Sequence, residues 1–310
     1  MSRSGPDPVT SSDHATVAER TQVEVVDRAA TAADGVAALD DQAHFDLQYG
    51  GGAAVRHTLA RSPGTDAVVG YAQLRLGLAA DDAAVGQLVI DPQHRGAGLG
   101  AAVVQKLIAQ AGSRRLRVWA HGDHPAARRL ADRLGFVRVR ELCQLRRALD
   151  DPLPAPRPTP GITLRTFRVG HDEEAWLAVN TAAFSDHPEQ GGLTADDLAR
   201  RIAQPWFDAA GFFLAERNGQ LVGFHWTKVH PAGSTGNRDA LGEVYALGVH
   251  PDAQGLGLGK TLTLIGLNSL RSRGLFEVML YVESDNAAAL ALYERLGFRH
   301  VSTDAMYERP

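Results

Sequence analysis

Two glycine-rich stretches have the residues and spacing to bind an anion. Residues 254–261, "QGLGLGKT", end in Gly-Lys-Thr, like the loop that holds the phosphates of a nucleoside triphosphate. That loop requires G-x-x-x-x-G-K-[ST]. Counting back from Gly259, the first glycine would be residue 254, which is Gln254. The spacing is therefore wrong for such a loop, which leaves a ligand-free glycine turn or a site for another anion.

A second copy of the loop favours the anion site. Residues 95–100, "RGAGLG", repeat the pattern, and each copy lies between a short apolar strand and a helix-like segment. Backbone N–H groups at a helix N-terminus, together with the helix dipole, attract phosphate groups. Glycine lets the phosphate approach the backbone, because it has no Cβ. We therefore expect a strand–loop–helix arrangement around each loop.

The two loops belong to a longer internal repeat. Residues 123–136, "DHPAARRLADRLGF", align without gaps with residues 285–298, "DNAAALALYERLGF". An apolar strand precedes each of these segments in both halves. The repeat indicates a tandem duplication of one α/β unit. The order of elements predicts a mixed, mostly antiparallel sheet with helices on both faces in each half.

A proline-rich segment separates the halves. Residues 150–161 read "DDPLPAPRPTPG", with proline at every second position from 152 to 160. Such a segment favours an extended, semi-rigid spacer. We therefore predict a disordered tail at 1–20, an N-terminal domain at 21–149, a linker at 150–160 and a C-terminal domain at 161–310. A turn at Asn218-Gly219 predicts a β-hairpin over residues 212–230.

The composition excludes several classes of protein. The chain has 310 residues, 44% hydrophobic and 22% charged, with a net charge of −4, which is typical of a globular protein and not of a nucleic-acid binder. No apolar run is long enough to span a bilayer, and the polar first twenty residues lack the apolar core expected of a signal peptide. The single cysteine, Cys143, disfavours disulfides and cysteine-built zinc sites. We expect a cytoplasmic protein, monomeric, without a metal or a membrane partner; His121, His124 and His187 follow no ligand spacing.

The loops resemble the hallmark of the GNAT superfamily of N-acetyltransferases, [QR]-x-x-G-x-[GA] between a strand and a helix. It occurs here as "RGAGLG" from Arg95 and "QGLGLG" from Gln254. The resemblance implies that each loop binds the pyrophosphate of acetyl-CoA and that the preceding strand binds the pantetheine arm. The implied cofactor-binding residues are Leu88, Val89, Ile90, Gly96, Ala97, Gly98, Leu99, Gly100 and Ala101 in the first half, and Leu247, Gly248, Val249, Gln254, Gly255, Leu256, Gly257, Leu258, Gly259, Lys260, Asn286, Ala287, Ala288, Ala289, Leu290 and Ala291 in the second.

A narrower resemblance, to the mycothiol synthase family, covers nearly the whole chain. It is carried by "WAHGDHPAAR", "HPEQGGLT", "GFHWTKVHP", "GEVYALGVHP" and "LYVESDNAAALALYERLGF". That family has two GNAT domains and catalyses the last step of mycothiol assembly. The resemblance implies acetyl transfer from acetyl-CoA to the cysteine α-amine of a cysteinyl-glucosaminyl-inositol.

The resemblance also implies an acid–base pair in the second half. An ammonium group must lose a proton before it attacks a thioester, and the departing thiolate gains from receiving one. Glu243, five residues before Gly248, matches the position of the general base, and Tyr293 matches that of the acid. An ordinary glutamate at a strand edge and a core tyrosine are the alternatives. Aligning Gly248 with Val89 places Ala84 opposite Glu243, and aligning the Leu-Gly-Phe segments places Ala131 opposite Tyr293. We therefore expect the first half to be non-catalytic.

Four further residues are implied as contacts of the acceptor, in addition to Glu243. Asp41 would reach in from the N-terminal domain, and the others lie in the second half: Glu189, Lys228 and Tyr281. Two alternative functions remain open. One is a GNAT enzyme for another small amine or a protein N-terminus, and the other is a non-catalytic acyl-CoA sensor.

Overall fold

The chain divides into two units. The computed structural model describes residues 9–77, 79, 82–150, 152–156, 159–185 and 187–310, with 188 and 189 described by their backbone alone. The first unit comprises the chain up to Cys143 with residues 233–238 and 302–310. The second comprises residues 144–232 and 239–301. The division thus differs from the predicted domains chiefly at the C-terminus, where residues 302–310 join the first unit.

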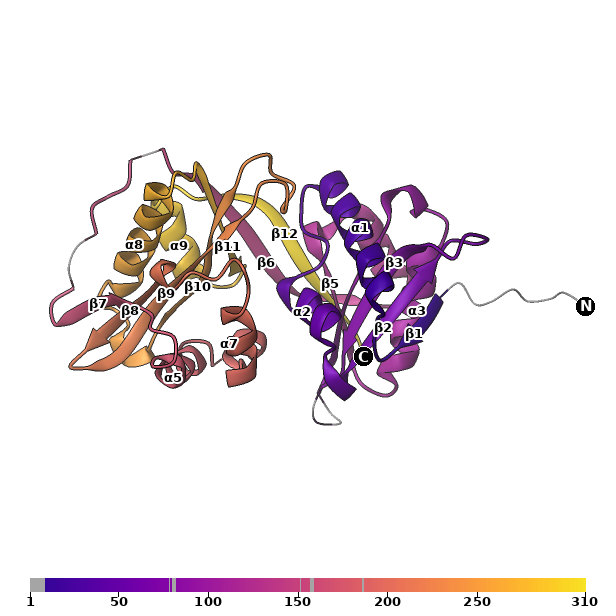
Figure 1. Ribbon diagram of the computed structural model, residues 1–310, viewed down its shortest axis with the longest axis horizontal. Helices are drawn as coiled ribbons and strands as arrows, with labels where there is room; N and C mark the ends of the chain where they lie inside the picture. The colour runs from indigo at the N-terminus through magenta and orange to yellow at the C-terminus, as the bar shows by residue number, and fades with distance from the viewer. Residues whose placement is uncertain (1–8, 78, 80–81, 151, 157–158, 186) are drawn as a thin grey trace, which may run out of the picture. The chain divides into compact units, whose positions relative to one another are not determined.

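The first unit is a mixed sheet in the strand order β1-β2-β3-β4-β5-β12 (Figure 1). The pairing of β4 with β5 is parallel, and the other pairings in this series are antiparallel. Its strands are β1 Val9–Ser12, β2 Val55–Arg61, β3 Val68–Arg75, β4 Ala84–Ile90, β5 Leu116–Ala120 and the end of β12 Arg299–Arg309. Its helices are α1 Val17–Asp34, α2 Asp41–Tyr49, α3 Leu99–Ala111 and α4 Pro125–Arg133, with single 3₁₀ turns at 52–54, 92–94 and 121–123.

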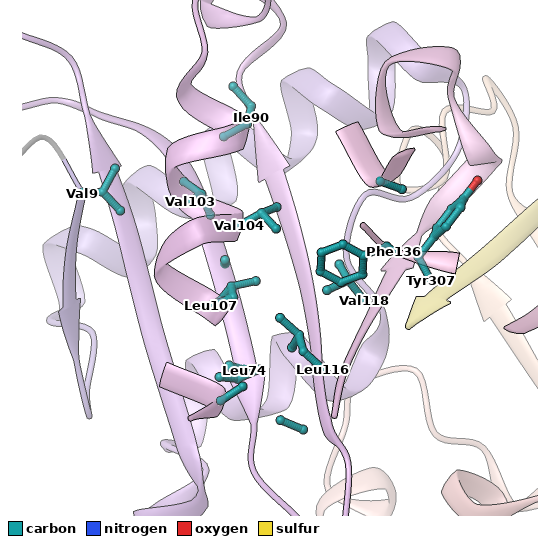
Figure 2. Close-up of a cluster of buried hydrophobic side chains, with 14 of the residues drawn as sticks. Val9, Leu74, Ile90, Val103, Val104, Leu107, Leu116, Val118, Phe136 and Tyr307 are labelled. Atoms are coloured by element: carbon teal, nitrogen blue, oxygen red, sulfur yellow. The ribbon is translucent and has the colours of Figure 1, made fainter. Parts of the chain in front are cut away.

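Alternate residues of the central strands are buried on opposite faces of this sheet. Tyr71 and Val89 belong to the core beneath α1 and α2, whereas their neighbours Ala72 and Ile90 belong to the core beneath α3 and α4. Figure 2 shows the second of these cores, in which side chains of α3 such as Leu107 lie over the strands. This alternation is what a strand covered by helices on both faces requires.

The expected disordered tail is wrong for residues 9–20. Val9 is buried, and strand β1 pairs with β2 from Val9–Ala60 to Ser12–His57. Thr16 then caps α1, and Glu19 completes a capping box by accepting the Thr16 N–H. The local sequence is polar, so only pairing with a distant strand reveals that this segment is ordered. Residues 1–8 lie outside the described part of the chain.

The second unit repeats the architecture in the strand order β7-β8-β9-β10-β11-β6. The pairing of β10 with β11 is parallel, while β7–β8, β8–β9 and β9–β10 are antiparallel. Its strands are β7 Ile162–Thr166, β8 Phe212–Arg217, β9 Gln220–His230, β10 Leu241–Val249, β11 Glu277–Glu283 and the end of β6 Val137–Ala148. Its helices are α5 Glu173–Ala183, α6 Pro188–Gly191, α7 Ala195–Ile202, α8 Leu258–Ser272 and α9 Ala287–Arg295, with 3₁₀ turns at 209–211 and 251–253.

The predicted hairpin is confirmed as β8–β9. Arg217 pairs with Gln220, and both turn residues have positive φ, 53° for Asn218 and 78° for Gly219. These angles are those of a type I′ turn, whose twist matches that of the flanking strands.

Each unit is a mixed sheet with flanking helices, so the predicted fold class is correct. The described residues of the proline-rich segment form no helix or strand.

Candidate active site

The glycine loops lead into the helices as predicted. Gly257 has φ 77° and precedes the first residue of α8, and no side chain caps this helix end. A Cβ built on Gly255 or Gly257 would meet no atom within 4 Å, so the space beside the loop is open. Gly96 and Gly98 repeat this geometry before α3. Each loop thus presents uncapped N–H groups at a helix N-terminus to open space, as an anion site requires.

The strands before the loops have free edges where the pantetheine arm is expected. Parallel pairing of β10 with β11 runs from Gly242–Val278 to Val244–Leu280, although β10 continues to Val249. In the first unit β4 pairs with β5 only as far as Gln87 and continues to Ile90. The predicted pantetheine-binding residues are those beyond the last pairs: Leu88, Val89, Ile90, Leu247, Gly248 and Val249. Backbone groups on that edge are available to a ligand.

A β-bulge distinguishes β10 from β4 and corrects the alignment of the two halves. The register of β10 on β9 shifts between Val244 and Ala246, so Tyr245 is an extra residue, whereas β4 runs without a shift against β3. Allowing for the bulge, Glu243 corresponds to Val85 and not to Ala84. Valine is no more able than alanine to take a proton, so the first unit still lacks a base at this position.

Glu243 is a cross-strand neighbour of two basic residues of β9. It exposes 7% of its surface, and in the sheet it pairs with Lys228. Its Oε2 lies 2.6 Å from Nε2 of His230. The carboxylate is therefore desolvated, and one of its oxygens is already hydrogen-bonded.

Tyr293 is buried in α9 and protonated at neutral pH. Its ring packs edge-on against Phe298, with the centroids 5.5 Å apart. Burial raises the pKa of its hydroxyl to about 12, because the phenolate would lose its hydration. The matching position in α4 is Ala131, which is also buried.

Lys228 is buried in an aromatic setting. Its Nζ lies 4.6 Å from the ring centroid of Trp206 and 5.2 Å from that of Tyr245, both within cation–π range. The Tyr245 hydroxyl accepts a hydrogen bond from Nε of Arg201 at 3.1 Å. The bulge residue Tyr245 is thus part of the wall that surrounds this lysine.

The other predicted acceptor contacts are spread over several elements. Tyr281 lies in β11, where its hydroxyl accepts a hydrogen bond from Nε2 of Gln144 at 2.7 Å. Glu189 lies in the short helix α6, and its side chain is outside the described part of the structure. Asp41 belongs to the first unit as the first residue of α2. The roles assigned to these residues stay predictions.

The first unit contains a cavity of about 650 Å³ along its glycine loop. Its wall includes predicted residues, namely Leu88, Val89, Ile90, Gly96, Gly98, Gly100 and Ala101, together with Ala131 of α4. At its rim Arg95 makes a bidentate ion pair with Asp34 at 2.7 and 2.8 Å. These hydrogen bonds raise the pKa of the guanidinium. The volume suits a small-molecule ligand.

His121, which also lines this cavity, is tied to the C-terminal strand. Its Nδ1 lies 2.8 Å from Oδ2 of Asp304, and its Nε2 lies 3.3 Å from Oε1 of Gln87. Burial alone lowers the pKa of this imidazole, but the Asp304 carboxylate outweighs it, so the net direction is upward. The residue is held by a carboxylate and an amide, as a structural histidine would be. Among the described residues, no group of three or more His, Cys, Asp or Glu side chains could hold a metal ion.

Three neighbours of the predicted acid–base site escaped sequence reasoning: His230, Trp206 and Tyr245. His230 stands two residues after Lys228 and so shares its face of β9, a signal that strand periodicity contains. The bulge at Tyr245 leaves no mark in the sequence pattern. Trp206 lies in the irregular segment after α7, where neither helical nor strand periodicity applies.

Comparison with known proteins places both units in one superfamily. The acetyltransferase (GNAT) family matches residues 27–136 and again 176–298. A mycothiol acetyltransferase of Thermobispora bispora is 52% identical over 281 residues, which cover 91% of this chain and 92% of that protein. A mycothiol acetyltransferase of Streptomyces coelicolor is 53% identical over 275 residues, covering 88% and 86%. The chain belongs to the mycothiol acetyltransferase family.

Solved structures share the fold of this mycothiol acetyltransferase family member. A tandem GNAT protein from the clavulanic acid biosynthesis pathway superposes with a TM-score of 0.70 at 21% identity, covering 97% of this chain and 98% of that one. A GCN5-related N-acetyltransferase from Sphaerobacter thermophilus superposes with a TM-score of 0.69 at 23% identity, covering 98% and 96%. At these identities the likeness concerns the fold alone. None of the helices in the described part of the chain is long and apolar enough to cross a membrane.

Proposed function

We propose that this chain transfers the acetyl group of acetyl-CoA to the cysteine α-amine of cysteinyl-glucosaminyl-inositol, and that its second unit performs the chemistry. The assignment of the acceptor rests on sequence identity: about half of the residues are identical to those of mycothiol acetyltransferases across most of both chains. The asymmetry between the units supports the assignment of the chemistry. Glu243 and Tyr293 have Val85 and Ala131 as their counterparts in the first unit.

The residues of the second unit fit acetyl-CoA. The N–H groups of the loop from Gly255 to Lys260 would hold the pyrophosphate, and the free edge of β10 at Leu247–Val249 would pair with the pantetheine arm. Asn286–Ala291, at the start of α9, would contact the cofactor from the other side. Bound acetyl-CoA supplies an activated acetyl thioester. The equivalent features of the first unit, with its cavity, support a second site for the same ligand.

Glu243 and Tyr293 move the protons of the reaction. Glu243 takes a proton from the acceptor ammonium, directly or through a water molecule, and frees the nitrogen lone pair for attack. When the carbon–sulfur bond breaks, Tyr293 gives its hydroxyl proton to the sulfur. Tyr293 starts in the required state, because a tyrosine whose pKa is raised to about 12 retains its proton at neutral pH. The nitrogen loses a second proton as the amide forms, and this proton restores the Tyr293 hydroxyl, while the first leaves Glu243 for solvent. The reaction thus yields the amide, the free thiol of coenzyme A and one proton.

The polar residues predicted to contact the acceptor suit a polyol. Lys228 and Tyr281, with Glu189 in α6, would hydrogen-bond the sugar and inositol hydroxyls, and buried polar groups discriminate strongly against analogues that lack hydroxyls. The predicted contribution of Asp41 stays a prediction. The product is a thiol, so we also propose the cytoplasm, where thiols are kept reduced, as its compartment.

Turnover with a panel of amines tests the proposal. We would measure release of coenzyme A with the cysteinyl pseudo-disaccharide, an aminoglycoside, a polyamine and a peptide with a free N-terminus. The proposal expects kcat/KM to be highest for the cysteinyl compound by at least about 100-fold, since losing several hydroxyl contacts costs that much or more. Equal turnover of another amine would overturn the acceptor. No turnover of any amine, with tight acetyl-CoA binding, would indicate an acyl-CoA sensor.

A further inference from the structure

We propose that His230 is a positioning residue for the general base, holding one oxygen of Glu243 so that the other faces the acceptor amine. This inference rests on the proposed role of Glu243, and it does not depend on which amine is the acceptor. His230 is the last residue of β9, and Glu243 lies in the neighbouring strand β10. It is a residue to which neither the family motif nor the predicted substrate contacts assign a role.

The sheet brings the two side chains together. Leu241 pairs with His230 and Glu243 pairs with Lys228, so His230 and Glu243 are diagonal neighbours on one face. Their side chains expose 13% and 9% and meet at 2.6 Å between Nε2 and Oε2. The distance and the burial describe a short, largely dry hydrogen bond.

The direction of this hydrogen bond follows from its partners. An ionised carboxylate can only accept, so Nε2 of His230 carries the hydrogen and donates it to Oε2. The same nitrogen cannot also take a proton from Glu243. His230 therefore orients the carboxylate and does not relay its proton. Oε1 is left as the oxygen that meets the ammonium or the intervening water.

The first unit lost both members of the pair. Once the bulge is allowed for, Val85 of β4 corresponds to Glu243, and its antiparallel partner Arg75 corresponds to Lys228. Counting two residues further along the chain, Gly77 takes the place of His230. The unit without a base thus also lacks the histidine. This is expected if the histidine positions the base and is not needed for the structure of the strand.

Without this donor, the carboxylate would rotate and populate several orientations. Misplacing a catalytic group by about 1 Å costs on the order of 100-fold in rate. We therefore expect His230→Leu to lower kcat by about 10- to 100-fold. The dissociation constant of acetyl-CoA should stay within about 2-fold, since the loop and the β10 edge are untouched.

The conservative variant separates positioning from other roles. In His230→Gln the amide Nε2 reaches about as far as the imidazole Nε2 and also donates, but it does not titrate. We expect kcat within about 3-fold of the wild type. His171→Leu, at an exposed position of the same unit, is the control for loss of a histidine. If His230→Gln is as impaired as His230→Leu, the imidazole itself takes up a proton and the positioning role is wrong.

A double-mutant cycle links the effect to Glu243. Adding His230→Leu to Glu243→Gln should cause little further loss of kcat, because the side chain that His230 positions is no longer a base. A further loss as large as in the wild-type background would overturn the proposal, as would full activity of His230→Leu. All variants are assayed with whichever amine the wild-type protein acetylates best, after thermal melts show that they fold. If Glu243→Gln alone retains full activity, the proposed base fails, and that outcome is distinct from failure of His230.

Discussion

At the scale of single residues, the proposed base and acid are equally buried but differently held. Glu243 and Tyr293 each expose 7% of their surface. Glu243 is fixed by a hydrogen bond from His230, whereas the described contacts of Tyr293 are with the ring of Phe298. A carboxylate held by a donor keeps one orientation, and a tyrosine held by packing keeps its proton. Substituting each tests a different property.

Glu243→Gln preserves shape and hydrogen bonding but removes the base. We expect kcat/KM to fall by about 10²–10⁴ at pH 7, the usual contribution of general acid–base catalysis. The deficit should shrink at high pH, where more of the acceptor is already free amine. Steady-state kinetics from pH 6 to pH 9.5 would measure it. Near wild-type turnover at pH 7 would remove Glu243 from the mechanism.

Tyr293→Phe should be milder. The thiolate of coenzyme A is a tolerable leaving group, so we expect a loss of about 10- to 100-fold in kcat, at or below the low end for general acid catalysis. Calorimetry should show nearly unchanged binding of acetyl-CoA. Tyr49→Phe, at an exposed tyrosine of α2, is the matched control. Loss of folding or of cofactor binding would instead mark Tyr293 as a structural residue.

At the scale of elements, the strand–loop–helix junction is duplicated but its use is not. Both loops keep two glycines at positive φ and a helix that begins without a side-chain cap. The strands before them differ, because β10 has a bulge at Tyr245 and β4 has none. The bulge lies between Glu243 and the free edge of β10 at Leu247–Val249. The anion site and the catalytic strand are thus separable features.

Glutamate substitutions in the first helical turns test this asymmetry. A Cβ on Gly259 lies 4.0 Å from Val249, and one on Gly100 lies 3.8 Å from Leu130, so neither clashes. Neither position has positive φ, unlike Gly257, where any side chain strains the backbone. A carboxylate at position 259 or 100 would repel the pyrophosphate of acetyl-CoA. We expect Gly259→Glu to lower turnover by about 100-fold or more, equivalent to about 2.8 kcal/mol of lost binding, and Gly100→Glu to retain most of kcat.

The controls for this pair are the alanine variants Gly259→Ala and Gly100→Ala, which add the Cβ without the charge. Calorimetry on both glutamate variants would also show how many acetyl-CoA molecules each protein binds. A folded Gly100→Glu protein as inactive as Gly259→Glu would make the first unit part of the chemistry.

At the scale of the whole molecule, a buried histidine links stability to pH. His225 of β9 exposes none of its surface, and its Nδ1 lies 2.7 Å from the Leu262 carbonyl of α8. A Cβ on Gly266 would lie 2.0 Å from its ring, so only glycine leaves room for it. Burial lowers the pKa of His225 to about 4, against the opposing effect of the Leu262 hydrogen bond. The folded protein therefore resists protonation at this site.

This shift predicts a loss of stability in mild acid. Above about pH 6.5 His225 is neutral in both states, and its contribution is fully present. As the pH falls from about 6.5 to 4, only the unfolded state binds the proton, which destabilises the fold by up to about 3 kcal/mol. Urea unfolding at pH 7.5, 6 and 5 would measure this against His225→Leu. Parallel pH dependence in the two proteins would contradict the prediction.

The sequence alone determined the features that depend on neighbours along the chain. The glycine loops, the hairpin turn at Asn218-Gly219 and the repeat are local, because turns and helix starts are set by the conformations a few residues can adopt. The absence of an acid–base pair in the first half also followed from residue type at repeated positions.

Only the tertiary structure decided what depends on strand pairing between distant residues. It ordered Val9–Ser12 against β2 and placed Ala305–Arg309 against β5 of the first unit. It inserted the bulge at Tyr245, which makes Val85 and not Ala84 the counterpart of Glu243. It also set His230 beside that carboxylate. Alternation along a strand specifies which face a side chain occupies, but the partner across the sheet is chosen by register, which is settled only when the whole sheet packs.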